Sequence, residues 1–221
     1  MRPSQLFLFV VLFAVSLKST QAIRPFECEV FDNTSGTPDT RFRGESKRDG
    51  GRGYDFVLLV VESFVANGRP FAIATTNGSR IYVNADYLQI FPGNMTDEFT
   101  GIVYFMSGLV WEWTGNGNAP TGLITGMADY IRLTAGWRYW GWPRRGSGLR
   151  WDEGYATTAN FLEFCELLRP GFVSDLNAMM IDSYSDVYFW ELLGKSVDVL
   201  WEEYKLFYGS PGPAPAQTFG Y

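Results

Sequence analysis

The chain has 221 residues, of which 46% are hydrophobic and 17% aromatic. Such a composition is typical of a well-packed globular protein and excludes an intrinsically disordered one. Its 18 basic and 24 acidic residues give a net charge of −6, which argues against nucleic acid and anionic membranes as partners.

The N-terminal residues have the anatomy of a signal peptide. Arg2 precedes an apolar run over residues 6–17, and small or polar residues follow up to Ala22. The run is too short to span a bilayer, which takes roughly 20 residues. We therefore predict a signal peptide over residues 1–22 and a secreted, extracellular product. Loss of Arg2 and Lys18 would leave 16 basic and 24 acidic residues, or −8.

The first half of the mature chain carries the predicted strands. Residues 23–52 are polar and irregular, with a short strand at 26–31. The apolar run over 54–66 predicts a buried helix, although its valines would also suit a strand. Residues 71–84 predict a β-hairpin, because the sequence Asn77-Gly78 favours a tight turn.

The second half is predicted to be helical. Thr96 or Asp97 is the expected cap of the first of these helices, and Gly194 the expected break in the last. Helices are predicted over residues 98–113, 122–135, 155–168, 172–183 and 187–208. An aromatic and basic loop spans residues 136–151, and a flexible Pro/Gly-rich tail spans 209–221. The pattern indicates an α+β fold: a mostly helical single domain over residues 23–208 with a small N-terminal strand and hairpin element.

The sequons and the cysteines are both compatible with passage through the secretory pathway. Asn33, Asn77 and Asn94 each begin an Asn-x-Ser/Thr sequon and are candidate glycosylation sites. Cys28 and Cys165 allow one disulfide in an oxidising compartment, the alternative being two buried free thiols.

Several segments together resemble the plant basic secretory proteins, a zinc-peptidase-like family. The likeness extends from about Ile81 to Tyr208 and is weaker before Phe71. It is carried by residues 101–120, 122–136, 150–155, 157–159, 161–163, 171–173 and 193–198. The resemblance implies a zincin-like fold, an apoplastic or cell-wall location in a plant, and a link with defence.

The zinc site of that family is not retained in this chain. The family has H-E-x-x-H where this chain has Phe105-Met106-Ser107-Gly108-Leu109. On a helix, two histidines four residues apart share one face and meet a single zinc, while the glutamate activates water. Thr125 stands at the position of the third ligand, a glutamate, and only Asp129 of the downstream acidic pair remains.

The sequence has no histidine at all. Metal-assisted hydrolysis needs ligands for zinc and a carboxylate to take a proton from water. The resemblance therefore implies a pseudoenzyme without catalytic residues, metal or cofactor, whose former site has become apolar core. An apolar pocket reused for a ligand is the alternative. The partner would be a cell-wall glycan or an extracellular protein.

Two other functions stay open. Carboxylates such as Glu112, Asp129, Asp152 and Glu153 could form a hydrolytic pair, although Asp152 and Glu153 also suit a cap of the helix that follows them. Exposed tryptophans could instead stack on sugars. The candidates are Trp137, Trp140 and Trp142 in the loop, whereas Trp111, Trp113, Trp151, Trp190 and Trp201 are predicted to be core. For the loop itself, a packed cluster with Arg138, Arg144 and Arg145 is the preferred interpretation.

Overall fold

The computed structural model describes residues 27–28, 41–43, 56–66, 69–70 and 72–209. They group into two compact units. Unit 1 contains the described residues up to Glu112 together with Ala135–Trp137, and unit 2 contains Trp113–Thr134 and the described residues from Arg138 onward. Nothing in the sequence indicates this division. The predicted signal peptide, Asn33 and residues 210–221 of the tail lie outside the described residues.

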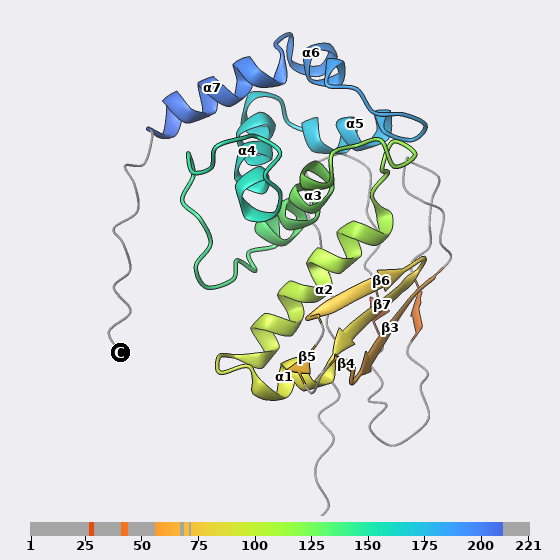
Figure 1. Cartoon of the computed structure of the whole chain (residues 1–221). Helices are drawn as coiled ribbons and strands as arrows, with labels where there is room; N and C mark the ends of the chain where they lie inside the picture. Colours follow the sequence, from red (N-terminus) through yellow and green to blue (C-terminus); the bar gives the residue numbers. More distant parts are fainter. Residues whose placement is uncertain (1–26, 29–40, 44–55, 67–68, 71, 210–221) are drawn as a thin grey trace, which may run out of the picture. The chain divides into compact units, whose positions relative to one another are not determined.

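Unit 1 contains a mixed sheet with the strand order β1-β2-β3-β7-β6. β3 and β7 are parallel, and the other neighbouring pairs are antiparallel. The strands are β1 Glu27–Cys28, β2 Arg41–Arg43, β3 Phe56–Glu62, β6 Ala74–Asn77 and β7 Arg80–Asn84. A separate antiparallel pair is formed by β4 Val65–Ala66 and β5 Arg69–Pro70. Figure 1 shows β3, β7 and β6 side by side.

The prediction of a helix over residues 54–66 was wrong. The segment forms β3, in which Val57 and Leu59 are each 1% exposed while Leu58 and Val60 are half-buried. β-Branched residues suit a strand because their side chains pack well on a pleated surface. Pairing with β2 on one side and β7 on the other therefore overrides the helical interpretation of a short apolar run.

The predicted hairpin is confirmed as β6 and β7, with its turn one residue later than expected. Asn77 pairs with Arg80, so that Gly78 and Ser79 are the two central residues. Gly78 has a φ of +58°. A glycine with positive φ at the first central position is the mark of a type II′ turn, whose twist matches that of the flanking strands.

Two helices complete unit 1, α1 Ala85–Ile90 and α2 Met95–Trp111. α1 was not predicted. The cap of α2 is Asn94, and not Thr96 or Asp97: its side-chain oxygen accepts hydrogen bonds from the amides of those two residues, at 3.0 and 3.3 Å. An asparagine cap satisfies amides that have no partner within the helix. α2 lies against β6 and β7.

Unit 2 is helical, as predicted. Its helices are α3 Thr121–Thr134, α4 Tyr155–Leu168, α5 Phe172–Met179, α6 Val187–Leu193 and α7 Val197–Tyr208. The predicted break is confirmed, since Gly194 ends α6 in the left-handed conformation at φ +70°. Helix and sheet together confirm the α+β class. None of the helices in the described segments is long and apolar enough to cross a membrane.

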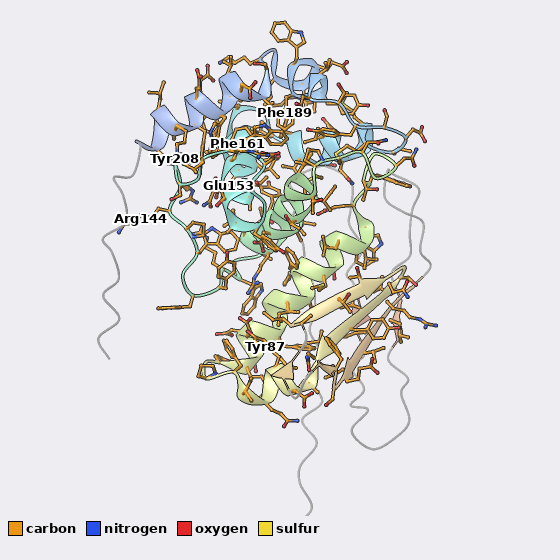
Figure 2. All side chains as sticks on the ribbon, viewed as in Figure 1. Tyr87, Arg144, Glu153, Phe161, Phe189 and Tyr208 are labelled. Atoms are coloured by element: carbon orange, nitrogen blue, oxygen red, sulfur yellow. The ribbon has the colours of Figure 1, made fainter. Side chains whose placement is uncertain are left out.

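Aromatic rings form much of the core of unit 2. Phe161, Phe189 and Tyr204 are each 0% exposed, and Figure 2 shows the first two inside the helical unit. The ring of Phe161 lies 6.2 Å from that of Phe189 and 5.7 Å from that of Tyr204. Such pairs add to the stabilisation from buried area alone, so α4, α6 and α7 are held to a common core.

Two glycines of α3 allow it to approach α4 and the turn before it very closely. A Cβ atom on Gly122 would lie 1.9 Å from the carbonyl oxygen of Asp152, and one on Gly126 would lie 2.3 Å from Cγ2 of Thr158. Both glycines have ordinary helical backbone angles, so glycine is required here because it has no side chain, and not because of its conformational freedom. Any larger residue would push the two segments apart.

Candidate functional site

The three family positions on α2 differ in their exposure. Phe105 and Leu109 lie four residues apart, on the same face of the helix, and both are half-buried. Met106 is 8% exposed and belongs to the buried face with Val103 and Val110. The expected fully apolar core is therefore found for Met106, whereas the face that would present two histidines in the family is less buried.

Thr125, at the position of the third ligand, makes local hydrogen bonds in unit 2. Its hydroxyl donates to the carbonyl oxygens of Thr121 at 3.1 Å and Gly122 at 3.3 Å, one turn earlier in α3. The same oxygen accepts from the amide of Tyr155 at 3.2 Å. A Cβ atom on Gly154 would lie 2.7 Å from that oxygen. The side chain therefore fastens the start of α4 to α3.

The turn that Thr125 fastens has an unusual backbone. Tyr155 has a φ of +46°, and it follows Gly154 at φ +96°. A tyrosine in the left-handed region costs on the order of 1–3 kcal/mol and persists only where its surroundings hold it. No sequence signal pointed to this strain. The hydroxyl of Thr125 is one of the groups that hold it.

We expect Thr125→Val to lower the free energy of unfolding by about 1 kcal/mol, because valine keeps the shape but leaves the Tyr155 amide without this acceptor. Thr125→Ser is the matched control and should retain most of the stability, since it keeps the hydroxyl. Urea unfolding of the two variants measures the difference. Full stability of Thr125→Val would show that the hydroxyl contributes nothing to holding the Tyr155 amide.

Asp129 is the retained acidic residue, and it is 1% exposed. Its Oδ2 atom accepts no hydrogen bond from the described residues. Burial raises the pKa of Asp129 to about 7, and the nearby charge of Arg132 opposes that rise. The guanidinium of Arg132 lies 5.0 Å from the ring centre of Tyr139, whose own pKa is raised by burial and by Asp129. Unit 2 thus contains a buried acid, one oxygen of which has no hydrogen-bond partner among the described residues, near a cation and an aromatic ring.

The other candidate carboxylates give no support to a hydrolytic pair within unit 2. Asp152 pairs with Arg150 at 2.7 Å, and Glu153 accepts from the amides of Leu149 and Arg150. The predicted capping of α4 by these two acids was wrong, because Gly154 is the cap residue and no side chain caps it. Instead, the hydroxyl of Thr158 accepts from the Gly154 amide.

Glu112 ends α2 in unit 1 and is 3% exposed. Throughout the described part of the chain, no three His, Cys, Asp or Glu side chains are placed to share a metal ion. The residues at the family's zinc positions therefore do not fit zinc. Phe105, Met106 and Leu109 have none of the usual zinc-binding groups, and the hydroxyl of Thr125 is already hydrogen-bonded to the amide of Tyr155.

The loop tryptophans have three different environments. Trp137 belongs to unit 1 and hydrogen-bonds the hydroxyl of Tyr104. In unit 2, Trp142 is half-buried and donates to Oδ1 of Asn160 at 2.9 Å. Trp140 is 96% exposed. The preferred packed cluster is thus found for Trp142 and Tyr139, whose rings lie 4.9 Å apart, but not for Trp140.

The remaining tryptophans mostly follow the prediction. Trp151 is 9% exposed, and the side chains of Trp111, Trp113 and Trp201 are half-buried. Trp190 was wrongly predicted as core: it is 60% exposed on α6. On a seven-residue helix whose neighbour Phe189 fills the core, the next position necessarily faces another direction.

Cys165 is 0% exposed and carries a free thiol among the described side chains. Burial raises the pKa of this thiol well above its ordinary value. The side chain of Cys28 lies outside the described residues. The disulfide between the two cysteines stays a prediction.

Comparison with known proteins places the chain in a family. The model of the family BSP, described as "Peptidase of plants and bacteria", matches residues 57–204. A protein from Boswellia serrata named "Basic secretory protease" is 38% identical over 66 residues, which cover 30% of this chain and 78% of that relative. No solved structure matches the chain.

Proposed function

Since the chain belongs to the BSP family, the peptidases of plants and bacteria, we propose that it is a secreted, zincin-like member that has lost zinc catalysis and acts by binding. The observation that carries this proposal is the donor set. The two histidine positions and the glutamate between them are Phe105, Leu109 and Met106. A zinc peptidase needs all three groups.

Secretion is part of the proposal and rests on the N-terminal sequence. Cleavage after Ala22 would release a mature chain whose domain spans residues 23–208. The relative from Boswellia serrata carries the word "secretory" in its name. Asn77 and Asn94 are both exposed, and we propose that they carry glycans. The cap made by Asn94 uses Oδ1, which leaves Nδ2 for the sugar. A plant extracellular location and a role in defence are included in this proposal.

Metal analysis combined with a peptidase assay tests the loss of catalysis. The purified mature protein is equilibrated with zinc, freed of excess metal and examined by mass spectrometry for bound zinc and on unfolded casein for cleavage. We expect far less than one zinc per chain and no zinc-dependent cleavage. Stoichiometric zinc or chelator-sensitive cleavage would refute the proposal.

A variant supplies the positive control for that assay. F105H/M106E/L109H restores the motif on one helix, where the histidines four residues apart share a half-buried face. We expect this variant to retain more zinc than the unmodified protein after the same treatment. A folded variant that retained no more zinc would show that two histidines on this helix do not hold the metal without the third ligand, whose position Thr125 occupies.

Carbohydrate binding is the form of binding that one observation favours. Trp140 is 96% exposed on a described loop, and an aromatic face can stack on the apolar face of a sugar. Trp142 is unsuited to the same role, because its indole is half-buried and bound to Asn160. A residual carboxylate hydrolase has no such support, since Asp152 and Glu153 are engaged within their own turn.

A further inference from the structure

Trp140 stands at the tip of a well-defined β-turn in unit 2. The amide of Trp142 donates to the carbonyl oxygen of Tyr139 at 3.2 Å, which closes a four-residue turn. Gly141, the third residue, has a φ of +87°. A glycine with positive φ at this position indicates a type II turn. Trp140 is therefore the second residue, where a side chain projects away from the closing hydrogen bond.

Both ends of this turn are held by neighbouring side chains. The ring of Tyr139 lies 4.9 Å from that of Trp142 and 5.0 Å from the guanidinium of buried Arg132. The indole of Trp142 donates to Oδ1 of Asn160 on α4. The side-chain Nδ2 of the same asparagine donates to the carbonyl oxygen of Pro143 at 3.0 Å. Because the turn is held this way, its backbone loses little conformational freedom when a partner binds to the exposed ring.

The chain after the turn is fastened just as closely. Arg145 makes a bidentate pair with Glu163 of α4, at 2.5 and 2.7 Å. The amide of Gly146 donates to the buried hydroxyl of Tyr204 at 2.7 Å, and Lys205 of α7 donates to the carbonyl oxygen of Gly146 at 2.7 Å. The loop is thus a fixed platform, and the position of the Trp140 backbone on it follows from the fold.

The charge of this platform is opposite to that of the whole protein. Residues 136–151 contain four arginines and no acidic residue, whereas the chain has a net charge of −6. Arg145 and Arg150 are paired with Glu163 and Asp152. Arg138 and Arg144 are exposed and form no ion pair with the described residues. Figure 2 shows Arg144 projecting outward from the loop.

We propose that the Trp140 turn, residues 138–144, binds an anionic polysaccharide built of uronic acids. The ring of Trp140 would stack on the apolar face of one sugar, and Arg138 and Arg144 would bind carboxylates of the same chain through their planar guanidinium groups. This inference rests on the proposed binding function and names the partner for it.

The same features fit other polyanions less well. A membrane surface holds a protein through buried apolar area together with several basic residues, and the turn offers one ring and two unpaired arginines. Nucleic acid has a much denser charge, and its binding depends on neutralising many phosphates with basic side chains, whereas the turn offers two unpaired arginines. A uronic acid chain combines stackable sugar faces with carboxylates, and these are the two kinds of group that one exposed ring and two exposed arginines bind.

Calorimetric titration of the mature protein with a decamer of galacturonic acid tests the proposal. We expect binding that weakens as salt is raised from 50 to 300 mM, and that is lost when the carboxylates are methyl-esterified. Trp140→Ala should weaken binding roughly five- to tenfold. Arg138→Gln and Arg144→Gln should each weaken it roughly threefold and flatten the dependence on salt.

Trp190→Ala is the matched control, because Trp190 is also exposed, at 60%, but lies on α6 and outside the loop. It should bind the decamer as the unmodified protein does. Lack of binding to the decamer, equal effects of Trp140→Ala and Trp190→Ala, or binding only to vesicles of anionic lipid would each overturn the inference. None of these results bears on whether the protein binds zinc or cleaves peptides. The proposed loss of zinc catalysis is tested separately, by the metal analysis and peptidase assay.

Discussion

Gly122→Ala is expected to lower the free energy of unfolding of unit 2 by at least about 3 kcal/mol. The added Cβ atom would lie 1.9 Å from the carbonyl oxygen of Asp152, 2.6 Å from its carbonyl carbon and 3.0 Å from the amide nitrogen of Gly154. All three are backbone atoms, so no side chain can rotate away. Alanine is the better helix former by about 1 kcal/mol, but the backbone clash outweighs that gain.

Urea unfolding followed by tryptophan fluorescence is the suitable measurement, since six of the eight tryptophans lie in unit 2. Thr121→Ala, an exposed position on the same helix, is the control and should change stability by less than about 0.5 kcal/mol. Equal stability of Gly122→Ala and Thr121→Ala would contradict the close approach of α3 to the turn at Asp152.

Asp129→Asn is expected to stabilise the protein at pH 8 and to have little effect near pH 4. The folded state holds the Asp129 proton with a pKa of about 7, against about 3.9 in the unfolded chain. The folded form is therefore favoured by a proton at low pH, and this contribution is lost as the pH rises through 7. Three pKa units correspond to roughly 4 kcal/mol as an upper bound, so we expect a gain of about 2–4 kcal/mol at pH 8.

The measurement is the free energy of unfolding of both proteins at several pH values between 4 and 8. Asp182→Asn, in an exposed turn, controls for the loss of one negative charge from an acidic protein. A stabilisation by Asp129→Asn that grew as the pH fell would contradict the assigned direction. Destabilisation at pH 8 would show that the ionised carboxylate is satisfied in the folded protein.

The helices of unit 2 were predicted well because local signals mark their ends. The bounds of α4, residues 155–168, were predicted to the residue, and Gly194 separates α6 from α7 as expected. The wrong prediction of a helix over residues 54–66 has a physical cause. β3 is a strand because two other strands pair with it, and a short run of apolar and β-branched residues does not encode those neighbours.

The candidate site likewise combines positions that the sequence could predict with contacts that only the structure shows. The resemblance to the family predicts that Phe105, Leu109 and Thr125 stand at the positions of the zinc ligands. The residue types could not show that the Thr125 hydroxyl accepts from the amide of Tyr155, because that contact joins residues 30 positions apart. Nor could they separate Trp140 from Trp142, which are two residues apart in one loop.

The amino-acid sequence by itself determined one absence: the chain has no histidine, and Phe105, Met106 and Leu109 stand where the resemblance places H-E-x-x-H. Only the tertiary structure decided which side chains are exposed and which are buried. Asp129 has an altered pKa because it is enclosed, and Trp140 is available to a partner because a glycine turn holds it outward. Burial and orientation depend on segments distant in sequence, and no local pattern encodes them.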